Sequence, residues 1–397
     1  MALSLLTRPR LWPSSLFKRK SQGPPNNKFA SLECQIDTPP IVVLRDGNDQ
    51  DGSAISASLL FNIIKDDIDV ESLHAVLRVH VVHKRPFKSR CKGCKHQITE
   101  LKRCQFIETT TRLKSNTHRF PFSYQVPSYV PPSMDTAIVS VSYEFEAIAF
   151  FRQPDQISKA PRIITLKRIL SVVRSIPVPS PISYSSRIFQ ASGIEVGCNF
   201  GSIMDPNTHN NASLTVSGLA SCLGPGGDMQ LWRLVKGSWM IQETVKTVAL
   251  ACTRHAQENG FIREAKSITQ EKTSVLGSAA FYEGWNTDDD AGTLEMEFPF
   301  LIKKGMHKLP RHTQDTGDVG DTSVTHALVV ELILVKEHYL KDRPGQAIRT
   351  GVGRILQSEH MVALSDYIRP SAGFAAQSLP CYQDLWPEPP VYQEEDV

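Results

Sequence analysis

The segment from Ala137 to Phe150 alternates between apolar and polar side chains, and this pattern restricts the possible folds more than any other part of the sequence. The apolar positions are Ala137, Val139, Val141, Tyr143, Phe145 and Ala147, and the polar positions are Ser140, Ser142, Glu144 and Glu146. A period of two is typical of a strand in an antiparallel sheet that buries one face. The sequence therefore predicts a long, half-buried β-strand here.

The residues just before this strand are rich in proline. Pro121, Pro127, Pro131 and Pro132 all fall between His118 and the strand. Because proline has no backbone N–H, it cannot donate to a sheet ladder. We therefore expect a short apolar edge strand, followed by a loop that contains most of the prolines.

Further runs that favour strands recur along the chain and are separated by turn residues. They cover residues 41–44, 58–64, 73–81, 193–200, 212–219, 231–235 and 293–300. Residues 324–338 are apolar on both faces apart from Glu331, so this run is expected to be central to its sheet. No window shows the longer period of an amphipathic helix. Such a series of strands predicts an all-β fold built from β-sandwiches.

The length and the hydrophobic content favour more than one domain. The chain has 397 residues, of which 41% are hydrophobic, and this is enough for two or three cores. A stiff Pro-rich segment near the middle resembles a linker. The predicted organisation is a disordered basic arm (1–30), a first sandwich (31–176), a Pro-rich linker (177–184), a second sandwich (185–345) and a tail (346–397). The tail is polar and poor in strand patterns, and one last short strand is expected at Gly353–Leu356.

Cysteine usage and hydropathy favour a reducing, cytoplasmic compartment. The 8 cysteines follow no framework pattern, and a chain of this size does not need disulfides to fold. We found no run of about 18 apolar residues, the length that a membrane-spanning helix requires. The arginine- and serine-rich arm also fits a mitochondrial leader, although Pro9 and Pro13 would break its helix. A mitochondrial location is therefore the less favoured alternative.

Several phrases of the sequence, taken in order, resemble one family. They include Lys84-Arg-Pro-Phe, Phe120-Pro-Phe-Ser-Tyr, Val126-Pro-Ser, Pro131-Pro-Ser, Val141-Ser-Tyr-Glu-Phe, Trp232-Arg-Leu and Thr325-His-Ala-Leu-Val-Val-Glu. Together they resemble the fungal α-arrestins, the arrestin-related trafficking adaptors, and within these the low-dye-binding subgroup. The resemblance implies two tandem immunoglobulin-like β-sandwiches, the arrestin fold.

A motif near the C-terminal end of the sequence predicts a protein partner. Pro389, Pro390 and Tyr392 form a Pro-Pro-x-Tyr motif, and a degraded copy holds Leu379, Pro380 and Tyr382. Two prolines favour the polyproline II helix, which fits the aromatic groove of a WW domain. Two weak sites on one tail would gain avidity for tandem WW domains.

The resemblance gives this motif a role. Family members recruit a HECT-type ubiquitin ligase that bears WW domains to membrane transporter cargo, and ubiquitin on the cargo drives endocytosis and vacuolar sorting. The implied location is the cytoplasm, with recruitment to the plasma membrane, endosomes or Golgi. An alternative is a sorting scaffold of the same fold that binds cargo without a ligase.

A pair of cysteines, Cys91 and Cys94, raises the question of a metal site. Zinc needs four ligands, which usually come from two such pairs. Only one tight pair is present, and Cys104 and His96 are the nearest residues that could complete a site. No thioredoxin-like setting accompanies the pair, so redox chemistry is not expected. Ordinary loop or core cysteines are favoured over a zinc site, and the sequence therefore predicts no cofactor.

The stretch around this pair is basic. Its cations are Lys84, Arg85, Lys88, Arg90, Lys92 and Lys95. Such a surface suits the acidic tails of membrane cargo or anionic lipid head groups. No nucleic-acid-binding motif accompanies it, so nucleic acid is not an expected partner.

Catalytic motifs are missing from the sequence. It contains no phosphate-binding glycine loop, no nucleophile elbow and no metalloprotease motif. His326, on a predicted strand, fits a packed histidine better than a ligand. We therefore expect a binding protein and not an enzyme.

Overall fold

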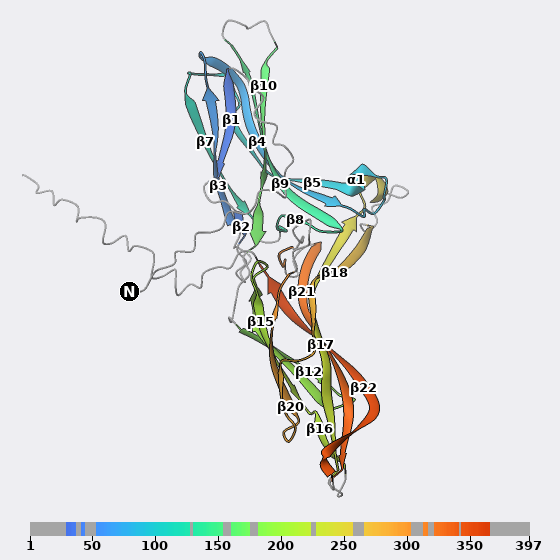
Figure 1. The fold of residues 1–397 in the computed structure, drawn as a ribbon. Coiled ribbons are helices and arrows are strands. Elements are labelled where there is room, and N and C mark those ends of the chain that lie inside the picture. The colour runs from blue at the N-terminus through green and yellow to red at the C-terminus, as the bar shows by residue number, and fades with distance from the viewer. Residues whose placement is uncertain are drawn as a thin grey trace, which may run out of the picture.

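The chain forms two sheet-built lobes that lie end to end in a computed structural model (Figure 1). The structure describes residues 29–36, 41–43, 53–127, 130–153, 160–174, 182–223, 228–256, 266–302, 313–316, 321–340 and 343–365. Nearly all of its regular structure is antiparallel strand, so the predicted all-β fold of sandwiches is confirmed.

The first lobe packs a small sheet against a larger one. The smaller sheet has the order β1 (Ala30–Ile36), β3 (Ser53–Ile63), β7 (Thr117–Val126). The larger has the order β10 (Arg162–Leu170), β9 (Val139–Arg152), β4 (Ile68–His83), β5 (His96–Ile107), with β6 (Thr111–Leu113) on β4 and β8 (Met134–Asp135) on β9. A short parallel pair joins β2 (Ile41–Val43) to β11 (Val172–Arg174).

Strand β9 has the predicted alternation and lies inside the larger sheet. Every second residue from Val139 to Phe151 is buried, and the residues between them are half-buried. Tyr143 and Phe145 are among the largest fully buried side chains in the described part of the chain. The prediction that this segment is a long strand with one buried face is confirmed.

Strand β7 corrects the prediction for the proline-rich segment. It runs for 10 residues and contains Pro121, which pairs with Ser58 of β3. It lies at the edge of its sheet, as expected, but it is longer than predicted because an edge position accommodates a residue without an N–H. Its apolar residues Phe120, Phe122 and Tyr124 pack against the core, whereas Pro121 is exposed.

The second lobe repeats the two-sheet arrangement. One sheet has the order β12 (Ile182–Phe189), β13 (Ile194–Gly201), β15 (Asn210–Ser217), β20 (Thr293–Phe300), β19 (Trp285–Asp288). The other has the order β14 (Ile203–Met204), β22 (Arg343–Leu364), β21 (Thr322–Leu340), β17 (Asp228–Leu250), β16 (Ala220–Leu223), with β18 (Ser267–Phe281) on β17. As predicted from its continuous apolar run, β21 is central to its sheet.

The boundaries of the second lobe differ from the predicted ones. Strand β12 begins at Ile182, inside the expected linker, and β22 continues to Leu364, inside the expected tail. The polar tail was expected to contain only a short strand at Gly353–Leu356, and β22 includes this segment. The strand is longer than expected because it pairs with β21 along most of its length.

The two lobes share part of one core. Val245 of β17 and Val324 of β21 belong to the second lobe, yet they pack within the hydrophobic core of the first. The remaining buried apolar residues of the second lobe form a separate core. The lobes are therefore packed against each other and not only tethered. Within the residues that the structure describes, no helix has the length and hydropathy to cross a membrane.

Candidate functional site

The tips of two hairpins, one from each lobe, meet at the side of the molecule (Figure 1). In the first lobe, a one-turn helix α1 (Lys92–Lys95) follows β4 and leads into β5. In the second, a one-turn helix α2 (Thr253–Ala256) follows β17 in the connection to β18. Hydrogen bonds between the hairpins run from Gln97 Nε2 to the Leu250 carbonyl (3.4 Å) and from Gln270 Nε2 to the Arg85 carbonyl.

Four metal-ligand side chains converge at this meeting point. The Sγ atoms of Cys91 and Cys252 are 3.7 Å apart. The Nδ1 atom of His255 lies 3.4 Å from Cys94 Sγ and 3.3 Å from Cys252 Sγ. One ligand atom from each of the four residues lies within 4.8 Å of all the others.

Two tight turns bring these side chains together. The backbone N–H of Lys95 donates to the Cys91 carbonyl, and the N–H of Ala256 donates to the Cys252 carbonyl. A Cβ atom on Gly93 would lie 3.2 Å from Cys252 Cβ and 3.3 Å from its Sγ, which is closer than most real contacts. The glycine therefore lets the second hairpin approach. The backbone N–H of Cys94 is the main cause that lowers the pKa of the Cys91 thiol.

The structure corrects the sequence-based grouping of these cysteines. Cys91 and Cys94 are joined by Cys252 and His255, and not by Cys104 and His96. Cys104 lies on β5 beside Phe122 and Phe145, where burial raises the pKa of its thiol. His96 begins β5 and is exposed.

Sequence reasoning missed Cys252 and His255. They lie 161 positions beyond Cys91 and Cys94 respectively. Their spacing could have identified them, because Cys252-Thr-Arg-His255 is a second pair of metal-ligand residues with two intervening residues, like Cys91 and Cys94.

A second contact between the two lobes is a buried polar network around Arg174. Arg174, at the end of β11, is 2% exposed. Its guanidinium donates to the carbonyls of Thr316 and Val130, and its backbone N–H donates to the side chain of Gln314. A cation of the first lobe is thus held by a segment that precedes β21 of the second.

His326 lies in the same region, and it is a packed histidine with charged partners. Its Nδ1 atom is 2.7 Å from Asp315, and its Nε2 atom is 3.5 Å from Glu243. Burial lowers the pKa of the ring, but the hydrogen bond with Asp315 and the negative charges of both carboxylates outweigh burial and raise the pKa to about 9. The ring is therefore protonated near neutral pH.

The predicted basic residues lie on the exposed surface around the first hairpin tip. Lys84, Arg85, Lys88, Arg90, Lys92 and Lys95 are all exposed. Lys84 differs from the rest because it forms an ion pair of 2.7 Å with Asp135 of β8. This lysine has a structural partner. The remaining five lie in residues 85–95, the segment that also contains Cys91 and Cys94.

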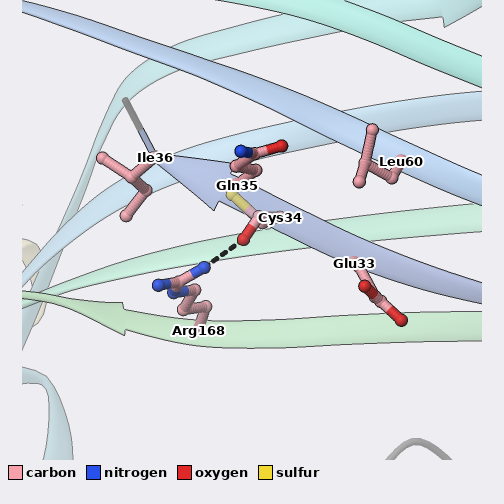
Figure 2. Close-up of a pocket in the computed structure, with 6 residues that line it drawn as sticks. All are labelled: Glu33, Cys34, Gln35, Ile36, Leu60 and Arg168. Atoms are coloured by element: carbon pink, nitrogen blue, oxygen red, sulfur yellow. Dashed lines mark hydrogen bonds between the residues drawn. The ribbon is translucent and has the colours of Figure 1, made fainter. Parts of the chain in front are cut away.

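A pocket of about 320 Å³ lies between β1 and β10 of the first lobe. Figure 2 shows Arg168 reaching across from β10 to donate a hydrogen bond to the Cys34 carbonyl. These two strands are the edges of different sheets. Arg168 thus donates a hydrogen bond to a carbonyl at an open sheet edge. We therefore assign Arg168 in this pocket a structural role and not a ligand-binding one.

The predicted WW-binding residues lie outside the described part of the chain. Pro389, Pro390 and Tyr392, with Leu379, Pro380 and Tyr382, follow the last described strand, β22. The basic arm of residues 1–28 also lies outside it.

A family model described as "LDB19: Arrestin_N terminal like" matches residues 72–259. This segment runs from β4 of the first lobe to just beyond α2 of the second. It contains both hairpin tips and all four residues of the cysteine–histidine cluster.

Relatives of this chain occur in yeasts. Two uncharacterised proteins of Schizosaccharomyces pombe are each 22% identical over 383 residues, covering 96% of this chain and 93% and 99% of their own lengths. Protein LDB19 of Saccharomyces cerevisiae is 28% identical over 201 residues, which cover 46% of this chain. The matched part spans only 24% of that longer protein.

Proposed function

The chain is a fungal arrestin-related protein, and on that premise we propose that it is an adaptor for ubiquitin ligation. Its folded lobes bind a membrane transporter, and its Pro-Pro-x-Tyr motif binds a HECT-type ligase through WW domains. The ligase then transfers ubiquitin to the transporter, which is sorted by endocytosis to the vacuole.

The Pro389-Pro390-Val391-Tyr392 motif is the observation that carries this proposal. Two prolines restrict the backbone before binding, so a WW groove loses less conformational entropy when it captures them. In a three-residue helix, Tyr392 returns to the face of Pro389 and adds an aromatic anchor. The motif follows two sandwiches that carry no recognised catalytic motif, which suits a protein that brings others together.

The exposed cations around the first hairpin tip support a membrane-side contact. Arg85, Lys88, Arg90, Lys92 and Lys95 project from one loop and its short helix. A group of lysines and arginines attracts acidic cytosolic tails and anionic head groups, with about 1 kcal/mol for each cation near a lipid surface. We propose this surface as the contact for cargo or lipid.

The alternative of the same fold is a sorting scaffold that binds cargo without a ligase. A pull-down with isolated WW domains separates the two. We expect Tyr392→Ala to weaken binding at least about tenfold, because a lost aromatic anchor is commonly worth more than 1.4 kcal/mol. Tyr382→Ala should have a smaller effect, and the double variant should abolish capture.

Tyr282→Ala is a matched control for this pull-down. Tyr282 is 66% exposed on the second lobe and lies far from the motif in sequence. Its loss should leave capture unchanged. If the double variant Tyr382→Ala, Tyr392→Ala binds WW domains as well as the wild type, the ligase proposal is wrong and the scaffold remains.

A further inference from the structure

We propose that Cys91, Cys94, Cys252 and His255 bind one Zn²⁺ ion, which fastens the first lobe to the second. The distances fit this ion. In a tetrahedral site with Zn–S of about 2.3 Å and Zn–N of about 2.0 Å, sulfurs are about 3.8 Å apart and sulfur and nitrogen about 3.5 Å apart. The sulfurs of Cys91 and Cys252 are 3.7 Å apart, and His255 Nδ1 lies 3.4 and 3.3 Å from the sulfurs of Cys94 and Cys252. All four ligand atoms lie within 4.8 Å of one another.

The donor set selects zinc over other metals. Three thiolates and one imidazole are one of the standard ligand sets of structural zinc. Calcium and magnesium prefer oxygen ligands, and none of the four residues offers one from its side chain. Four protein ligands leave no open position, so the ion would stabilise the fold and not perform chemistry.

A disulfide does not explain the arrangement. A disulfide requires an S–S distance of about 2.05 Å, whereas Cys91 and Cys252 lie 3.7 Å apart, and Cys91, Cys94 and Cys252 are all free thiols. Thiols are also weak hydrogen-bond partners for one another. Hydrogen bonds among three thiols and one imidazole nitrogen would therefore stabilise this arrangement little, whereas a cation between them would stabilise it strongly.

The surroundings are built for a compact, negatively charged cluster. Cys94 is fully buried, and Gly93 leaves the space that Cys252 occupies. Zinc with three thiolates carries one net negative charge. Lys92, Lys95 and Arg254 lie on the same two short helices and offset this charge.

The position of the site defines its role. Two ligands come from the β4–β5 hairpin of the first lobe and two from the β17–β18 connection of the second. Neither pair fills a tetrahedral site alone. The ion would hold the basic loop, which carries Lys92 and Lys95, in a fixed position relative to the second lobe.

Metal analysis of the purified full-length chain tests the proposal. After exposure to zinc chloride and removal of excess metal, we expect about one zinc per chain, the stoichiometry of a four-ligand site. Cobalt(II) in place of zinc should give the intense visible bands of a tetrahedral sulfur-rich site. Cys252→Ser and the pair Cys91→Ser, Cys94→Ser should each lose the metal, because both lobes must contribute.

Two further variants keep the test decisive if a ligand variant folds poorly. His255→Cys supplies a fourth thiolate and should retain zinc, whereas His255→Ala should not. Cys104→Ser is the matched control, because Cys104 lies outside the cluster, and it should keep the full metal content. The proposal is overturned if the folded wild-type chain takes up no zinc, or if either lobe's ligands can be removed without loss of the metal.

Discussion

The free energy of unfolding should fall by about 3 kcal/mol when the pH is raised from about 6 to about 10, because His326 loses its proton. The folded pKa of this buried ring is about 9, above its ordinary value of 6.5. A group with a raised folded pKa stabilises the protein fully below its unfolded pKa, and this stability is lost as the pH rises through the folded pKa.

Urea unfolding at several pH values between these limits measures the effect. His326→Gln is the control variant, since a neutral amide can still hydrogen-bond but cannot titrate. It should be less stable than the wild type near pH 6, because Glu243 and Asp315 remain buried without the cation. If the free energy of unfolding of the variant depends on pH as that of the wild type does, the ion pairs of His326 do not cause the pH dependence.

Phe145→Ala should lower the free energy of unfolding by about 3–5 kcal/mol, the usual cost of removing a buried aromatic ring. Phe145 is 1% exposed on β9. It stacks on Phe122 of β7 with ring centroids 4.9 Å apart and an interplanar angle of 6°. The substitution therefore removes a contact that joins the two sheets of the first lobe.

Ser142→Ala is the matched control for this substitution. Ser142 lies on the opposite, half-buried face of the same strand. Its replacement should change stability by no more than about 0.5 kcal/mol. Equal effects of the two substitutions in denaturant unfolding would contradict the alternating burial of β9.

The sequence predicted those elements whose pattern is local. The alternation from Val139 to Phe151 and the apolar run of β21 each reflect burial against direct neighbours, so period and composition were sufficient. The expected edge strand is longer than predicted, because an edge position lets β7 continue through Pro121. The sequence indicated only Gly353–Leu356 of β22, because the rest of this polar strand is specified by its pairing with β21 and not by a local pattern.

The cysteine–histidine cluster shows more clearly that local sequence patterns do not reveal contacts between distant segments. The Cys91-x-x-Cys94 turn is visible in the sequence, but its partners come from another lobe. Only the packing of the lobes brings α2 beside α1, and that packing depends on long-range contacts such as Val245 and Val324 in the first core. Nearest-in-sequence reasoning therefore selected Cys104 and His96. The buried pairing of His326 with Asp315 and Glu243 was hidden for the same reason.

Proximity labelling with the tagged full-length chain in its own cells tests the adaptor proposal most directly. We expect both a WW-domain HECT-type ligase and membrane transporters among the labelled proteins. In the double variant Tyr382→Ala, Tyr392→Ala, the ligase should be lost while the transporters remain. Labelling of transporters without any such ligase, or of mitochondrial matrix proteins alone, would contradict the account.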